Sequence, residues 1–143
     1  MLGKGGIFAD QCKVDGYIGA NFLIFEDLTN HLPEDLREFN KKYVPVYMKN
    51  NPNKTKVGAG LGCGALWTIC KKLQVGDIVL SPNGRGEYYV GQIVGNYYYV
   101  PDTDLQHRRK VQWYDKTIAR ADMSEELRHS AGSIGTCCDI TNY

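Results

Sequence analysis

The amino-acid sequence predicts a mixed α+β fold, in which a β-barrel of five to six strands is flanked by two to three helices. Short runs rich in β-branched and aromatic residues, bounded by Gly, Pro, Asn or Asp, crowd residues 77–115 and predict strands. Two stretches before them, residues 36–47 and 57–74, carry apolar residues at helical spacing. Helices and strands do not alternate, so a parallel sheet is not expected, and closure into a barrel leaves no unpaired strand edge.

The composition is that of one globular domain spanning residues 1–143. Hydrophobic residues make up 43% of the chain and charged residues 23%, which is ordinary for such a domain. The net charge of +1 is no global basic signature, so any nucleic-acid-binding surface must be a local patch. The N-terminus has no apolar signal-peptide core, and no apolar run is long enough to cross a bilayer. We therefore expect a soluble, cytoplasmic protein with no membrane partner.

The first half of the chain is predicted to form one strand and one helix. Residues 1–15 are Gly-rich and irregular, residues 16–24 form a strand, and a loop follows. Pro33 followed by two acids fits a helix start, since acids favour the positive end of the helix dipole. Pro45 is expected to kink or end this helix before a basic loop over residues 49–56. The apolar face of the helix comprises Leu36, Phe39, Tyr43, Val44 and Tyr47.

The second half is predicted to contain most of the strands. Residues 57–74 are Gly-rich at first and helical afterwards, and the helix has a core stripe of Leu61, Ala65, Ile69 and Leu73. Strands are predicted over residues 77–81, 87–94, 96–100 and 109–115. Asp122 with Glu125 resembles a capping box, which opens a short helix ending by Gly132. Residues 133–141 then form the last strand.

Sequence motifs for catalysis or metal binding are weak or missing. The five cysteines include no C-x-x-C pair, and no histidine lies at ligand spacing from them, so a zinc site is not expected. There is no H-E-x-x-H and no G-x-S-x-G. The stretch "SPNGRG" lies between two predicted strands and lacks the Lys-Ser/Thr of a phosphate-binding loop. Asn83-Gly84 indicates a hairpin turn there, with Arg85 at its tip as a possible phosphate contact.

The conspicuous residues are aromatic and basic. Trp67 points roughly 160° from the centre of the predicted core stripe, so it either packs under another segment or lines a pocket. Phe22 is either core or a stacking wall, and Asp27 either turns the loop or accepts a hydrogen bond from a base edge. The basic run at residues 107–110 and the lysines of residues 41–72 are either solvated charges or a phosphate-contacting rim.

Three segments in this order resemble a known family. "GYIGANFLIFEDL", then "ALWTICKKLQVGDIVLSPN", then "YYVGQIVGNYYYVPDTDLQHRRKVQW" are similar to PUA-like modules of the EVE and YTH type. Such modules stand at the N-termini of modification-dependent restriction endonucleases, including Mrr-like and McrB-like proteins. The likeness covers about residues 16–114. It implies a PUA-like barrel that flips a modified base out of a duplex and stacks it in an aromatic pocket.

The resemblance also implies site residues and partners. The base-binding pocket would comprise Phe22, Asp27, Gly62, Trp67, Ser81, Asn83 and one tyrosine of Tyr97–Tyr99, for which Tyr98 is proposed. Gly62 lies in the loop before the Trp67 helix. The basic residues themselves, independently of the resemblance, predict the contacts to the nucleic-acid backbone, which would comprise Lys54, Lys56, Arg85, Arg108 and Arg109. The expected partner is double-stranded DNA carrying N6-methyladenine, 5-methylcytosine or 5-hydroxymethylcytosine. A nuclease domain or subunit would cut that DNA, and no metal, cofactor or catalytic residue is expected in this chain.

Three other functions remain open from the sequence. The chain could be a PUA-like RNA-binding domain, which would favour single strands and contacts to 2′-hydroxyls. It could be a barrel that binds a small molecule or another protein, whose pocket would lack a basic rim. It could also be a small enzyme that uses a cysteine or a histidine.

Overall fold

The fold of residues 6–126 is described by a computed structural model. Three α-helices and four strands follow one another in that range as α1 (Ala9–Asp15), β1 (Tyr17–Ala20), α2 (Leu36–Asn50), α3 (Lys56–Trp67), β2 (Ile78–Pro82), β3 (Glu87–Tyr99) and β4 (His107–Ala119). A π-helical turn, Thr68–Lys72, continues α3, and a 3-10 turn, Arg120–Asp122, follows β4. The predicted α+β class is confirmed.

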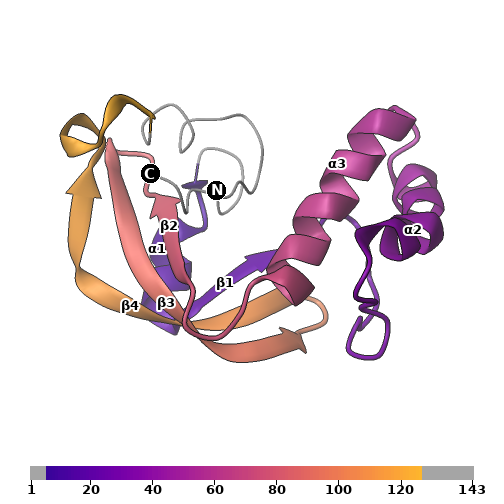
Figure 1. Cartoon of the computed structure of the whole chain (residues 1–143), viewed down its shortest axis with the longest axis horizontal. Coiled ribbons are helices and arrows are strands. Elements are labelled where there is room, and N and C mark those ends of the chain that lie inside the picture. Colours follow the sequence, from indigo (N-terminus) through magenta and orange to yellow (C-terminus); the bar gives the residue numbers. More distant parts are fainter. Residues whose placement is uncertain (1–5, 127–143) are drawn as a thin grey trace.

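The strands of this range form one antiparallel sheet in the order β1-β4-β3-β2. β3 and β4 are each 13 residues long, and their pairing shifts register in two places, between Tyr89 and Gly91 and between Ile93 and Tyr97. Bulges of this kind bend a strand and increase its twist. The sheet accordingly curls into a half-barrel, with α1 beside it and the α2–α3 pair at its other end (Figure 1).

The predicted number of strands exceeds the number found among residues 6–126. Residues 87–94 and 96–100, predicted as two strands, are one continuous strand, because Gly95 lies in a bulge and not in a turn. The predicted strand over residues 133–141 and most of the helix predicted after Asp122 lie outside the described residues. A curled four-stranded sheet is therefore what the structure shows.

Helix α2 confirms the predicted apolar face but not the predicted end. The carboxylate of Asp35 caps the helix by accepting a hydrogen bond from the Arg37 backbone N–H at 2.9 Å. Phe39, Tyr43 and Tyr47 are buried on one face. Pro45 lies inside the helix, which continues to Asn50, so it does not end the helix as one prediction held. Buried aromatic side chains on both sides of Pro45 hold the two halves on one core, and this packing outweighs the local preference.

Helix α3 replaces the predicted glycine-rich loop. Thr55 caps it, since its hydroxyl accepts a hydrogen bond from the Gly58 N–H at 3.0 Å. A Cβ at Gly62 would lie 3.0 Å from the Tyr47 ring, so glycine allows α3 to approach α2 closely. The buried residues are Ala59, Cys63 and Leu66. Leu61 is 73% exposed, so the predicted core stripe was wrong at Leu61, because packing against α2 selected a different face of the helix there. The stripe was right at Ile69, which is buried in the core, and Leu73 packs against that core.

Helix α1 falls in the segment that was predicted to be irregular. It ends at Gly16, whose φ of 75° is the left-handed conformation that glycine adopts readily. The indole N–H of Trp113 on β4 donates to the Cys12 carbonyl at 3.0 Å and ties α1 to the sheet. Among residues 6–126, no helix has both the length and the apolar character needed to cross a membrane.

Candidate functional site

A cavity of about 420 Å³ lies where the end of α3, the bulge of β3 and the loop before α2 meet. It is lined by Thr29, Leu32, Cys70, Lys71, Leu73, Gln74, Val75, Asn96, Tyr97 and Arg109. These residues come from four separate segments of the chain, so the cavity is a product of the tertiary fold. Its volume falls in the range of small-molecule sites, roughly 300–1,000 Å³.

Two backbone irregularities shape this cavity. In the π-helical turn, the Leu73 N–H donates to the Thr68 carbonyl, five residues back, at 2.9 Å. In the bulge of β3, residues 94–96 stand opposite the single residue Lys110 of β4. Both kinds of irregularity are frequent beside functional sites, because they redirect side chains that a regular helix or strand would place elsewhere.

Arg109 joins these two walls. Its Nε donates to the Gly95 carbonyl in the bulge at 2.9 Å, and its Nη1 donates to the Ile69 and Leu73 carbonyls at 3.1 and 2.5 Å. The side chain is buried, and this burial lowers the pKa of its guanidinium. An arginine still remains protonated at neutral pH. Arg109 was predicted to contact the nucleic-acid backbone. In the structure it is buried, holds the two walls together as a brace, and borders the cavity.

The open side of the cavity carries unengaged polar groups. Gln74 and Asn96 are exposed, and their side-chain amides make no hydrogen bond within residues 6–126. The Lys71 ammonium pairs with the Glu34 carboxylate at 2.8 Å. Each free amide can donate and accept, so together they can bind the polar edge of a flat ligand.

A buried polar network holds the loop of the cavity against the sheet. The Tyr97 hydroxyl accepts from the Leu28 N–H at 3.1 Å and lies 2.8 Å from His107 Nδ1, while His107 Nε2 lies 2.6 Å from the Ile24 carbonyl. Because that carbonyl can only accept, Nε2 carries the proton and Nδ1 accepts from Tyr97. Burial lowers the pKa of His107, which agrees with a neutral ring.

A second cavity, of about 430 Å³, adjoins the first, since both are lined by Thr29 and Leu32. Its other lining residues come from the segment before α2 and from α2 itself. The ammonium of Lys42 lies 3.3 Å from Nδ1 of His31 there. A half-open space thus lies on each side of the Thr29–Leu32 loop.

The residues predicted for the base-binding pocket line neither of these two cavities. Phe22 is half-buried against the core with a φ of 52°, and Asp27 accepts from the Thr29 N–H at 2.9 Å. The Trp67 indole donates to the Pro33 carbonyl at 2.9 Å, which matches the packing alternative for this residue. Their role in binding a base stays a prediction.

The other pocket predictions lie on the strands or on α3. Ser81 is buried on β2, and the amide oxygen of Asn83 accepts from the Arg85 and Glu87 N–H groups at 2.8 and 3.3 Å. Asn83 thus braces the hairpin turn that its sequence predicted. Tyr98 is 37% exposed on the face of β3 opposite Tyr97. Gly62 lies in the contact between α2 and α3, as described above.

The residues predicted to contact the nucleic-acid backbone fall into two groups. Lys54 and Lys56 are exposed near the start of α3 and form no ion pair within residues 6–126. Arg85 pairs with Asp10 at 3.1 Å and donates to the Tyr89 hydroxyl at 2.9 Å, so it ties the hairpin to α1. The Arg108 guanidinium lies 4.0 Å from the centroid of the Tyr17 ring. Both arginines therefore already have partners within the fold.

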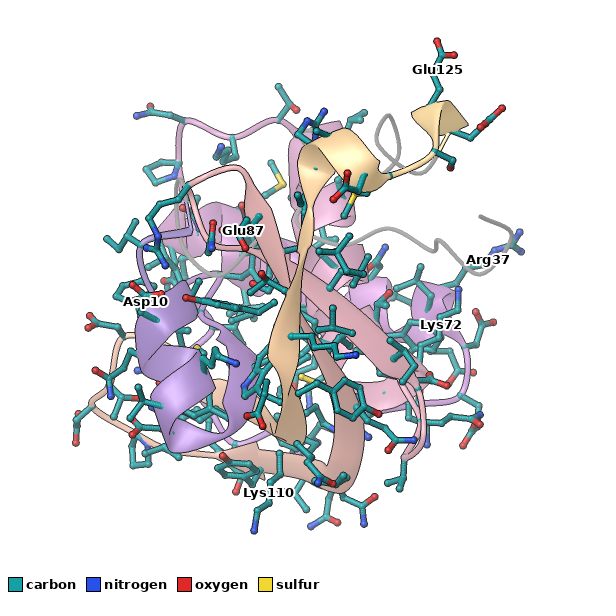
Figure 2. The ribbon with its side chains drawn as sticks, turned by 90° about the vertical axis from the view of Figure 1, so that its left-hand side faces the viewer. Asp10, Arg37, Lys72, Glu87, Lys110 and Glu125 are labelled. Carbon is teal, nitrogen blue, oxygen red and sulfur yellow. The ribbon has the colours of Figure 1, made fainter. Side chains whose placement is uncertain are left out.

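Three further exposed cations, Lys72, Arg37 and Lys110, take no part in these contacts. Figure 2 labels Lys72, which follows Lys71 of the cavity, and Arg37 in the first turn of α2; both lie on the side of the view opposite Asp10. Lys110, opposite the bulge of β3, lies at the lower end of the view. Lys72 thus belongs to the π-helical turn, and Lys110 lies on β4 opposite the bulge of β3.

The cavity residues Gln74, Asn96 and Tyr97 were not all foreseen. Tyr97 was only one of the three candidate tyrosines, from which Tyr98 was predicted, whereas Tyr97 lines the cavity. A usable signal was Gly95, because a glycine inside a strand pattern indicates a bulge or a close backbone approach. No sequence signal marked the π-helical turn.

The described cysteines are buried, and no metal-binding cluster is found among the described residues. Cys12, Cys63 and Cys70 are buried, and burial raises the pKa of Cys12 and of Cys63 to about 11. Such thiols are protonated at neutral pH and are poor nucleophiles. Within residues 6–126, no group of three or more His, Cys, Asp or Glu side chains could hold a metal ion.

Comparison with known proteins places the chain in a family. Residues 8–140 match the model of a family described as "Domain of unknown function (DUF8426)". No curated protein and no solved structure matches the chain. Because the match spans most of the sequence, the chain belongs to the DUF8426 family.

Proposed function

We propose that this chain is a non-catalytic DNA-binding module that recognises a modified base flipped out of a duplex. The base would enter the cavity between the π-helical turn and the bulge of β3. The module would be the specificity part of a modification-dependent restriction system, in which a nuclease domain or subunit cuts the DNA. The proposal includes a PUA-like barrel, and the curled half-barrel with helices beside it is compatible with part of one.

The observation that carries the proposal is the mixed lining of this cavity. Gln74 and Asn96 offer free amides, Tyr97 offers an aromatic ring, and Leu32 and Val75 offer aliphatic surface. A nucleobase needs this combination, because it has a flat apolar face and an edge of donors and acceptors.

The energetics suit a reader of modified bases. Extruding a base costs a few kcal/mol, and stacking on an aromatic ring returns about 1–3 kcal/mol per base. A methyl group buried against aliphatic side chains adds about 0.8 kcal/mol, or roughly a fourfold preference over the unmodified base. Burial of one methyl group therefore gives only a modest preference for the modified base. Contacts to the edge of the base must supply the remaining selectivity.

The decisive experiment compares matched duplexes by fluorescence anisotropy. Each duplex carries one central base, either unmodified, N6-methyladenine, 5-methylcytosine or 5-hydroxymethylcytosine, and a single-stranded RNA of the same sequence serves as control. We expect one modified duplex to bind several times more tightly than its unmodified match. Equal binding of all duplexes would refute the proposal, and tighter binding of the RNA would favour the RNA-binding alternative.

Variants at the cavity locate the binding. Gln74→Ala and Asn96→Ala should each weaken binding of the preferred duplex by about fivefold, the value of one hydrogen bond of roughly 1 kcal/mol. Gln112 on β4 is the matched control, since it is exposed and lies outside both cavities. If Gln112→Ala weakened binding as much as the cavity variants did, the base would not be bound in this cavity.

A further inference from the structure

One donor group of Arg109 is left over by the fold. Nε and Nη1 are used by the Gly95, Ile69 and Leu73 carbonyls, whereas Nη2 donates in no hydrogen bond found among residues 6–126. Arg109 as a whole is only 3% exposed. The enclosed side-chain atoms of this range that lack a partner do not include Nη2. Nη2 is therefore not fully enclosed, and Arg109 lines the cavity.

The charge of Arg109 is also incompletely matched. The ion pairs found in the described range join Lys71 to Glu34 and Arg85 to Asp10, and none includes Arg109. Backbone carbonyls and the negative end of the α3 dipole stabilise the guanidinium. The carboxylate that acts on its charge is that of Asp77, which already accepts from the Gln74 N–H at 2.9 Å. A buried cation with a free donor is a strong site for an oxygen acceptor.

We infer that Nη2 of Arg109 donates to a carbonyl oxygen of the flipped base, so that the module selects a 5-modified cytosine over N6-methyladenine. The inference rests on the proposed function and names its substrate class. Cytosine carries a carbonyl at C2, whereas adenine carries none and would leave the buried donor unpaired. The cavity is also lined by the Lys71 ammonium, but this group pairs with the Glu34 carboxylate, so Nη2 of Arg109 is the charged donor without an acceptor among residues 6–126. One such donor fits a base carbonyl better than it fits a phosphate, whose several oxygens require several donors.

The ligand side supplies the first test, which leaves the protein unchanged. Duplexes with 5-methylcytosine, 5-hydroxymethylcytosine, 5-methyl-2-thiocytosine or N6-methyladenine at one position are compared by anisotropy. We expect the protein to bind the duplexes with carbonyl-bearing cytosines at least about tenfold more tightly than the duplexes with the 2-thio analogue or N6-methyladenine. The reason is that the latter two lose a charged hydrogen bond to oxygen. Preferred binding of N6-methyladenine would leave the proposed function standing and overturn the inference. Competition by inorganic phosphate for the 5-methylcytosine duplex beyond the effect of matched ionic strength would overturn it too.

Variants of the protein test whether Arg109 contacts the base or only holds the fold together. Arg109→Lys keeps the charge but cannot hold the carbonyls and the ligand in one planar fork, so the ratio of 5-methylcytosine to 2-thio binding should fall towards one. The control is Arg37→Lys, since Arg37 is exposed in the first turn of α2 and lines neither cavity, and it should leave that ratio unchanged. If Arg109→Lys folds and keeps the full ratio, Arg109 is a structural brace only and the inference is wrong. If Arg109→Lys does not fold, the 2-thio comparison in the unchanged protein decides.

Discussion

The network of Tyr97 and His107 yields a prediction whose size follows from the structure. Tyr97→Phe removes one hydroxyl that bonds the Leu28 N–H at 3.1 Å and His107 Nδ1 at 2.8 Å. Leu28 and His107 are both fully buried. Each buried group left without a partner costs about 1–3 kcal/mol, which gives roughly 2–6 kcal/mol for the pair. Because Tyr97 borders the open cavity, water can reach part of the site, and we expect about 2–3 kcal/mol.

The assay is equilibrium unfolding in urea with fluorescence and circular dichroism as probes. A loss of 2–3 kcal/mol should lower the midpoint by about 1–2 M urea at an unchanged slope. Tyr98→Phe is the matched control, since Tyr98 is the next residue of β3 and is 37% exposed on the other face. It should change stability by less than about 0.5 kcal/mol.

Two outcomes would contradict this reasoning. If the two variants had the same midpoint, the buried network would contribute nothing to stability. If Tyr97→Phe were much less stable and its slope also changed, the variant would have lost more than two hydrogen bonds, and the estimate from single groups would not apply.

The remaining predictions concern α3 and pH. Gly60→Ala should stabilise the protein by about 0.5–1 kcal/mol, because a Cβ at Gly60 meets nothing within 4 Å and alanine favours a helix. Gly62→Ala, two residues along, should lose that gain, since its Cβ would lie 3.0 Å from the Tyr47 ring; equal thermal midpoints for the two variants would refute the packing argument. Burial lowers the pKa of His107 from its ordinary 6.5, although nearby carboxylates oppose this. The unfolded chain therefore binds a proton at a higher pH than the folded protein does. The free energy of unfolding should be highest above pH 6.5 and should decrease as pH falls from there towards the folded pKa. The slope should stay below about 1.4 kcal/mol per pH unit, and it should persist in His31→Gln; stability in urea that did not fall from about pH 7.5 to about pH 5.5 would show that His107 has no lowered pKa.

Local chemistry was enough to predict several elements of the fold. The face of α2 with Phe39, Tyr43 and Tyr47 followed from helical spacing. The hairpin at Asn83-Gly84 followed from turn preference, and the structure adds that the Asn83 side chain caps it. Such features depend on residues a few positions apart, so a single sequence carries their signal.

Other elements were mispredicted because distant contacts outweighed local preference. The glycines of α3 favour a loop by themselves, yet they allow the helix to approach α2 and its Tyr47 ring. Leu61 belongs to a regular four-residue repeat but lies on the exposed face, because α2 packs on the other side. Gly95 was expected to separate two strands, whereas its carbonyl accepts from Arg109 within one bulged strand.

The sequence by itself determined the α+β class, the apolar face of α2, the hairpin and the richness in tyrosine. Only the tertiary structure decided where a ligand can enter. The cavity is formed by Leu32, Gln74, Asn96 and Arg109, which lie far apart in the chain and meet through a π-helical turn and a strand bulge. Arg109 illustrates the reason. In the sequence it is one cation of a basic run, whereas burial against three carbonyls makes it a brace with one donor that has no partner among residues 6–126.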